Sequence, residues 1–311
     1  MIQDNEIKTQ VSPFAIREGE IKVFDGKDGY VSMNQIIHKI DIGHITDIHF
    51  AILDLVNKFE FITSRQLYQM LEIKGIDAKS QEKLNNKLEQ LVKLKILTRY
   101  YFSSEEGKGI FRIYCMDKMG KYLLTSKEEE CKWQPSDNTK PVAMIKKRLA
   151  GNQTIIAYLR KVKAFDEYIV KPQLTAKVAG KTFKASGGGV KLTKNSKSIN
   201  FVFEIVRRED DWQNKLVERM KWYKDFYDNF TPGDSGFSVI PQLIIICEDE
   251  KNMAETFKIV VTKNLEIDKI KLYFSTDLRQ NNDTLESTLV EFKLVDGKYK
   301  MENIEIKLLG I

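Results

Sequence analysis

The chain has 311 residues, of which 42% are hydrophobic and 30% charged, values typical of a globular protein with room for two domains. No run approaches the roughly 18 apolar residues of a membrane span, and residues 1–10 lack the apolar segment of a secretion signal. The three widely spaced cysteines, Cys115, Cys131 and Cys247, argue against a disulfide framework or a zinc module. We therefore expect a cytoplasmic protein without membrane contact.

The net charge of +6 is distributed unevenly. Residues 131–230 contain 21 Lys+Arg and 10 Asp+Glu, a net charge of +11, whereas residues 1–130 (19 against 20) and 231–311 (10 against 14) carry −1 and −4. One contiguous basic segment favours a polyanion, most simply nucleic acid, as partner. A solvated lysine-rich hairpin is the alternative. The lysines expected to contact DNA in this segment are Lys177, Lys181, Lys184, Lys191, Lys194 and Lys197.

The first third of the sequence predicts three short helices followed by a β-hairpin. Residues 18–33 alternate around a glycine-rich turn and predict an additional hairpin at the start. Thr63 and Ser80 are expected N-caps, and Gly75 is expected to end the second helix. Helices are predicted over residues 46–59, 64–74 and 81–95, and β-rich runs within 96–116. This order is that of a winged helix-turn-helix, which we assign, with the first hairpin, to residues 1–124.

The third of these helices is the expected DNA-reading element. In a winged helix this element enters the major groove with its N-terminal polar face toward the base edges. Asn and Gln can pair with adenine, and Lys can contact phosphate or guanine. The candidate residues on this face are Lys79, Gln81, Lys83, Asn85, Asn86 and Lys87. A protein-interaction role for the same module is the alternative.

A linker and a second domain are predicted after the hairpin. Residues 125–141 combine a charge run with a Pro-Ser-Asp-Asn cluster and predict a linker. From residue 142 to 311 the order is a helix, several strands, and then helices alternating with strands, which predicts an α/β domain with a mixed sheet. The fold class is therefore α+β or α/β.

The segment "INFVFEIVRREDDWQNKLVERMKWY" (199–223) places Glu204 in the middle of a hydrophobic strand. Metal-dependent nucleases hold one or two divalent ions with carboxylates from neighbouring strands, aided by a lysine. The lysine position two residues after Glu204 holds Val206, and the preceding "GGGVKLTKNSKSIN" contains no acid. The site therefore looks degraded. If it were a nuclease using Mg²⁺ or Mn²⁺, Asp166 or Glu167 would be the companion acid; otherwise no cofactor is expected.

The helix after this strand carries a basic and aromatic pattern. Lys215, Arg219 and Tyr223 are spaced i, i+4 and i+8, which places them on one face, and Arg207 lies between strand and helix. Such a stripe suits phosphate contacts and base stacking, so all four residues are candidates for DNA contact. The alternative is an ordinary amphipathic helix packed on the sheet.

Three histidines, His38, His44 and His49, lie within twelve positions. Metal binding would require convergent geometry and usually a fourth ligand, and no cysteine or carboxylate stands at a suitable spacing. We expect surface or capping histidines.

The two halves together resemble the replication-relaxation family of Gram-positive bacteria and their mobile elements, which joins a winged helix to a PD-(D/E)xK nuclease-like domain. The matching pieces are "FVFEIV", "NKLVERMKWY" and "QLIIICEDEKNMAETFKIV", and the resemblance covers about residues 45–280. It implies a DNA-associated role in replication or maintenance of mobile DNA. The glycine- and lysine-rich "SGGGVKL" replaces the acidic strand start of the family, which puts metal-dependent cutting in doubt.

The sequence thus favours a non-catalytic, double-stranded-DNA-binding protein of a plasmid, phage or conjugative element. A metal-dependent nuclease using Glu204 is one alternative. An adaptor that holds a replication or conjugation protein is the other.

Overall fold

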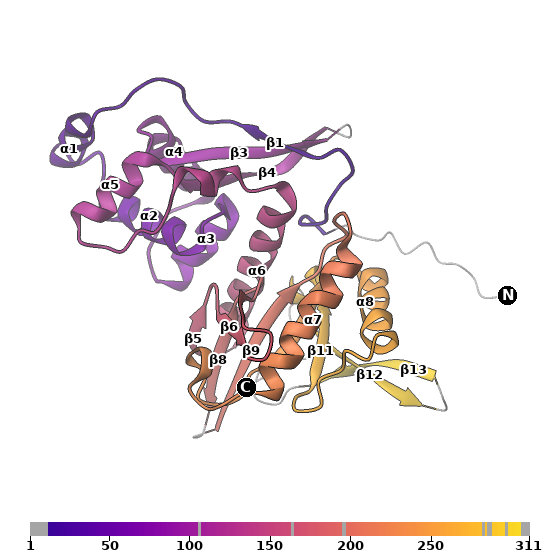
Figure 1. Cartoon of the computed structure of the whole chain (residues 1–311). Helices are drawn as coiled ribbons and strands as arrows, with labels where there is room; N and C mark the ends of the chain where they lie inside the picture. The colour runs from indigo at the N-terminus through magenta and orange to yellow at the C-terminus, as the bar shows by residue number, and fades with distance from the viewer. Residues whose placement is uncertain are drawn as a thin grey trace.

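The structure is a computed structural model, and it describes residues 12–104, 107–162, 165–194, 197–281, 284, 288–295 and 298–305, without the side chains of 107–110, 295 and 298. Over these residues the fold is mixed α and β, with antiparallel and mixed sheets. Figure 1 shows two layered regions joined by one long helix, α6 (Val142–Lys161). No helix in the described part of the chain is long and apolar enough to cross a membrane.

The first region consists of short helices around a small antiparallel sheet of order β1-β3-β4-β2. Its elements are β1 (Ile21–Phe24), α1 (Met33–Asp41), α2 (Asp47–Phe59), β2 (Ile62–Thr63), α3 (Ser64–Ile73), α4 (Gln81–Lys93), β3 (Leu97–Ser104), β4 (Gly107–Met116) and α5 (Lys118–Ser126). The expected caps are present, because the Thr63 and Ser80 side chains accept from the backbone amides three residues on. Gly75 adopts a φ of 70° just after α3, as expected of a glycine that ends a helix.

The predicted hairpin over residues 18–33 does not form. β1 instead pairs with β3, with Phe24 opposite Tyr100, and the chain then runs into α1. The Asp25 carboxylate bonds to Arg99 Nε at 2.8 Å, which fixes the end of β1 against β3. The first half of the segment is a strand as predicted, but its partner is the distant β3, and residues 25–32 form no strand.

The second region contains a seven-stranded sheet of order β13-β12-β11-β10-β9-β8-β5. Its elements after α6 are β5 (Phe165–Ile169), β6 (Gln173–Ala176), β7 (Lys181–Lys184), β8 (Gly189–Lys194), β9 (Lys197–Ile205), α7 (Trp212–Asp228), β10 (Gln242–Cys247), α8 (Glu250–Thr262), β11 (Leu272–Thr276), α9 (Asp277–Asn281), β12 (Leu289–Val295) and β13 (Lys298–Ile304), with short 3₁₀ turns at Pro135–Thr139 and Asp234–Gly236. β9, β10 and β11 are parallel, and the outer strands pair antiparallel.

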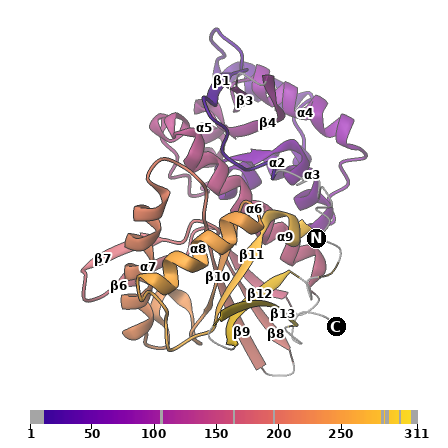
Figure 2. The same ribbon diagram turned by 90° about the vertical axis from the view of Figure 1, so that its right-hand side faces the viewer.

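Alternation along β9 assigns its side chains to the two faces of this sheet. Phe201 and Phe203 pack in the core that includes α6, whereas Val202 packs in the core that includes α7 and α8. In Figure 2, α8 crosses in front of the sheet and α7 lies beside it on the left. Glu204 lies two residues after Val202 and therefore on the same face of the sheet, so its carboxylate is directed toward α7.

The helix α6 belongs to both regions. Ile155 and Ile156 pack in the core of the first region, while Leu149 packs in the core of the second. Buried amides reinforce this contact: Gln66 Nε2 donates to the carbonyl of Leu149 (2.7 Å), and Asn152 Nδ2 donates to that of Phe61 (2.7 Å). The segment between α5 and α6, predicted as a linker, is also attached, for example by Asn138 Nδ2 donating to the Met116 carbonyl.

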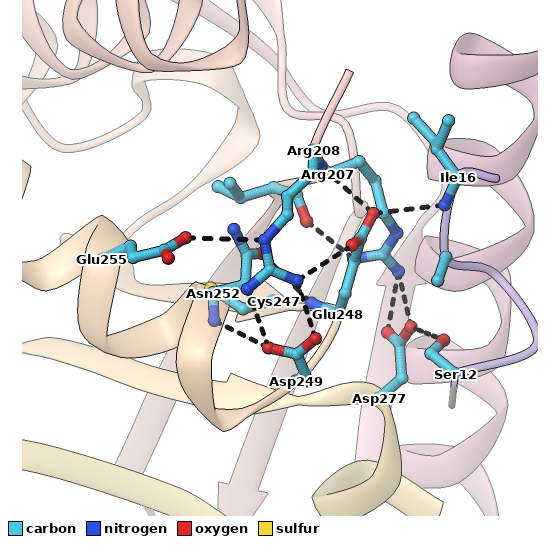
Figure 3. A network of polar contacts seen from close by, with 12 residues as sticks. Ser12, Ile16, Arg207, Arg208, Cys247, Glu248, Asp249, Asn252, Glu255 and Asp277 are labelled. Carbon is cyan, nitrogen blue, oxygen red and sulfur yellow. Dashed lines mark hydrogen bonds and ion pairs between the residues drawn. The ribbon is translucent and has the colours of Figure 1, made fainter. Parts of the chain in front are cut away.

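The N-terminal segment 12–20 packs against the carboxyl ends of β9, β10 and β11. Figure 3 shows the buried Arg207 guanidinium, which forms two 2.8 Å bonds to Asp277, while Ser12 donates to the same carboxylate. The amide of Ile16 donates to Glu248 at 3.3 Å. The end of the sheet at which open α/β folds usually bind ligands is thus covered here by the chain's own N-terminal segment.

Candidate nucleic-acid interface

The Glu204 carboxylate accepts hydrogen bonds from several donors on the α7 face of β9. Arg219 contributes Nε to Oε1 (3.1 Å) and Nη2 to Oε2 (2.7 Å), a bidentate pair. The Tyr223 hydroxyl (2.7 Å) and the Ser186 amide (3.3 Å) also donate to Oε2. The carboxylate is 5% exposed, and four donors occupy it.

The electrostatics agree with this geometry. Burial alone would raise the pKa of Glu204, but the Arg219 charge and the hydrogen bonds from Arg219 and Tyr223 outweigh it and hold the pKa below its usual value. The same carboxylate raises the pKa of the Arg219 guanidinium. Glu204 is therefore an ionised structural carboxylate rather than a free metal ligand.

The segment before β8 approaches β9 closely at Gly187. Gly187 donates its amide to the Phe203 carbonyl (2.9 Å), and a Cβ added to it would stand 2.7 Å from Phe203 Cβ. On its other side lies Gly151 of α6, whose own added Cβ would stand 2.6 Å from Gly187 Cα. The glycines of "SGGGVKL" therefore permit α6 to pack closely on the sheet, on the face opposite the Glu204 carboxylate, and this segment contains no acid.

Asp166 and Glu167, the alternative companions of Glu204, lie too far away. Glu167 is opposite Lys191, which is opposite Asn200 on β9. Glu204 is therefore two strands away and four residues further along, or about 10 Å across and about 13 Å along the sheet. Two ligands of one divalent ion each stand about 2.0–2.6 Å from it, so this pair cannot share a metal. The residues that the structure describes contain no cluster of three or more potential metal ligands.

Three residues predicted to contact DNA have other partners in the structure. Arg207 is fully buried in its pair with Asp277, and Tyr223 is fully buried under Glu204. Arg219, with 21% of its side chain exposed, is bonded to Glu204 and to the Lys184 carbonyl. The i, i+4 face of α7 was recognised correctly, but Arg219 and Tyr223 turn toward the sheet. Lys215, 51% exposed and 3.2 Å from Glu209, remains at the surface.

The lysine-rich segment is divided between two hairpins. Lys177 follows β6, and Lys181 and Lys184 lie on β7, so all three belong to a small separate sheet. The other members, Lys191, Lys194 and Lys197, lie on β8 and β9 of the large sheet. Lys177 pairs with Asp234 (2.7 Å), and Lys191 with Glu167 (2.6 Å). The lysines that are contiguous in sequence are therefore divided between two sheets, and two of them are paired with acids.

The polar residues of α4 occupy two different environments. Gln81 and Asn85, spaced i and i+4, line a groove of about 1130 Å³. Lys83 and Asn86 are exposed and do not line it, and Lys87 is half-buried. Lys79, which precedes the helix, is 66% exposed and forms a 2.6 Å ion pair with Asp77. The predicted reading helix thus presents amides to the groove and lysines outside it.

We call this cavity the α4–α6 groove. It is enclosed by parts of the chain that are distant from one another in sequence. Its walls are the N-terminal ends of α3 and α4, the β3–β4 hairpin, the second half of α6, α9 and the segment at Phe14. Four cations line it, and Asp25 is the single acid among its lining residues, so three positive charges are in excess. These cations are Arg65, Arg112, Arg160 and Lys161.

Two of these cations have no competing partner. Arg65 and Arg160 are exposed, and within the described residues neither forms a hydrogen bond or ion pair. Arg112 lies 3.2 Å from Asp25, and Lys161 donates to the Gln280 carbonyl (2.9 Å). None of the four was predicted from the sequence, because they lie in three separate segments and only the packing of α6 against the first region brings them together.

The half-buried ring of Phe111 also lines the groove. Its ring centroid lies 5.8 Å from that of Phe14 and 6.4 Å from that of Phe102. Backed by these two aromatic residues, the ring is fixed in position, as a stacking surface must be.

His49, one of the three clustered histidines, is a capping residue. Its Nδ1 accepts from the Thr46 amide (3.1 Å) at the start of α2, and its Nε2 lies 3.1 Å from Gln90 Oε1. Burial lowers its pKa. The capping role expected for these histidines is met by His49.

No protein-family model matches this chain, and no curated protein matches it.

Proposed function

We propose that this chain binds DNA without cutting it. The observation that carries the proposal is the α4–α6 groove, in which the amides of Gln81 and Asn85 lie among four cations. Amides can pair with base edges and arginines with phosphates, so the groove combines the two kinds of contact that DNA recognition uses. The occupied state of Glu204 supports the absence of catalysis.

The finer fold assignment is part of this proposal. The order α2-β2-α3-α4-β3-β4 fits a winged helix-turn-helix, and the order β8-β9-α7-β10, with Glu204 on β9, fits a nuclease-like domain. Through the resemblance of these parts to the replication-relaxation family, we place the chain in replication or maintenance of a plasmid, phage or conjugative element.

The test is a gel-shift titration with duplex DNA at low salt, alongside incubation of supercoiled plasmid with Mg²⁺ or Mn²⁺. We expect a shifted complex that weakens as salt rises, and intact plasmid. Nicking that is lost in Glu204→Ala would establish the nuclease alternative instead. Absence of any DNA complex, with a replication or conjugation protein co-purifying, would establish the adaptor alternative.

A further inference from the structure

The α4–α6 groove has a size and a shape that select among forms of DNA. A helix of about 10–12 Å diameter fills the roughly 12 Å major groove, so a duplex read by α4 must pass on both sides of it. Along the Gln81–Asn85 face, α6 stands across the groove with Gln153 and Arg160 in its wall. Gln153 Nε2 even reaches Gln69 Oε1 of α3, at 3.4 Å. A duplex cannot enclose α4 from this side.

The volume of the α4–α6 groove also argues against a bound duplex. Pockets that hold drug-sized ligands occupy roughly 300–1,000 Å³, so about 1130 Å³ accommodates a few nucleotides and not a turn of duplex. Proteins bind unpaired strands with a cationic groove that follows the backbone and with aromatic rings on which bases stack. Arg65 on α3 and Arg160 on α6 provide the positive charge for the backbone, and Phe111 provides the ring for base stacking.

We propose that the α4–α6 groove holds an unpaired DNA segment, with bases stacked on Phe111 and phosphates bound by Arg65 and Arg160. The exposed Lys83 and the half-buried Lys87 lie outside the groove, on the part of α4 that remains open to a duplex. The chain therefore prefers a junction, in which a duplex contacts α4 from outside and its unpaired tail enters the groove. This inference rests on the proposed DNA binding and specifies its substrate.

The experiment compares three fluorescent probes by anisotropy with the full chain. They are a blunt duplex of about 20 base pairs, or two helical turns, and the same duplex with a 3′ or a 5′ tail of about 8 unpaired nucleotides. We expect at least one tailed probe to bind about tenfold more tightly than the blunt duplex, as one stacked base and its phosphate contacts would give.

Four variants test whether the preference for the tailed probe arises in the α4–α6 groove. Arg160→Ala and Phe111→Leu should each weaken the tailed complex about five- to tenfold and leave the blunt complex unchanged. Lys83→Ala, outside the groove, should weaken both complexes equally. Lys258→Ala on α8, exposed and outside the groove lining, should change neither. Phe111→Leu keeps an apolar side chain against Phe14, and a urea midpoint for each variant verifies folding.

The outcomes separate this inference from the function on which it rests. Equal affinity for blunt and tailed probes, or equal loss of both in Arg160→Ala, would refute the groove assignment while DNA binding stands. Absence of binding to every probe at low salt would refute both.

Discussion

Glu204, a residue type common in active sites, is fully engaged in hydrogen bonds within the fold. On a hydrophobic strand, a single carboxylate is costly unless it is paired and hydrogen-bonded. Here Arg219 and Tyr223 meet that requirement from one face of α7. The carboxylate thereby holds α7 on the sheet, which is a role in stability.

Replacing Glu204 by Gln should therefore destabilise the protein without altering DNA affinity. The buried Arg219 charge loses its partner, which costs about 3 kcal/mol in the free energy of unfolding, since removing one member of a buried pair costs about 3–5 and Arg219 is partly screened by solvent. Urea denaturation measures this loss. Glu218→Gln, on the exposed side of the same helix, is the matched control and should change little. Normal stability with lost DNA binding would assign Glu204 to the interface.

His49 gives the first region a defined sensitivity to acid. Its pKa is lowered in the folded state, so below the unfolded value of about 6.5 the unfolded chain binds a proton that the folded chain resists. Stability should consequently be full above this pH and fall as pH decreases through it, by at most about 1.4 kcal/mol per unit.

The variant His49→Gln isolates that effect. Gln at this position can accept from the Thr46 amide as His49 does, so the cap is kept without a titrating group. Urea midpoints between pH 7.5 and 5.5 should then depend less on pH than in the native chain. The exposed His38→Gln variant is the control, and a pH dependence unchanged by His49→Gln would show that other groups cause it.

At the scale of elements, local patterns predicted most helices and strands, but not their partners. The caps at Thr63 and Ser80 and the apolar run of β9 are local signals, and the structure confirms them. The helix α1 was not predicted, although Ser32 and Gln35 form a capping box whose residue pattern is present in the sequence. The pairing of β1 with β3 and the passage of α6 between two cores depend on distant segments, so no local period encodes them.

The attachment of α6 to the first region should depend on Asn152. Its Nδ2 donates to the carbonyls of Phe61 and Phe59, both buried. Asn152→Ala removes the donor to the Phe61 carbonyl, which should cost about 1–3 kcal/mol in the free energy of unfolding. The Phe59 carbonyl still accepts from the Phe61 amide at 2.9 Å. The neighbouring Gln153→Ala, which removes only 3.4 Å contacts, should cost less than about 1 kcal/mol. Equal urea midpoints for the two variants would contradict this ranking.

The N-terminal segment depends on the Arg207–Asp277 pair. Asp277→Asn leaves a fully buried guanidinium with a neutral partner, and should cost about 3–5 kcal/mol in the free energy of unfolding. Ser12→Ala removes one hydrogen bond to the same carboxylate and should cost about 1 kcal/mol. Urea denaturation compares the two, and limited proteolysis reports whether the segment is released. A smaller loss in Asp277→Asn than in Ser12→Ala would show that the ion pair does not anchor it.

At the scale of the whole molecule, charge in sequence proved a poor guide to charge at a surface. Several cations of the basic middle third pair with acids from elsewhere, such as Lys146 with Glu20 and Arg208 with Asp249. The excess positive charge that remains in the α4–α6 groove comes partly from outside that third, from Arg65 and Arg112. Composition could predict a polyanion partner, but the location of the site required the tertiary contacts.

The salt dependence of binding distinguishes the charged residues of the groove from its aromatic residue. Each neutralised phosphate of a single strand contributes about −0.7 to the slope of log affinity against log salt. Removing Arg65 and Arg160 together should therefore reduce the slope for the tailed duplex by about 1.4. Phe111→Leu removes stacking and no charge, so it should lower the affinity at every salt concentration and leave the slope unchanged. Anisotropy titrations at several salt concentrations measure both quantities, and a changed slope in Phe111→Leu would mean that the strand no longer follows the same cations.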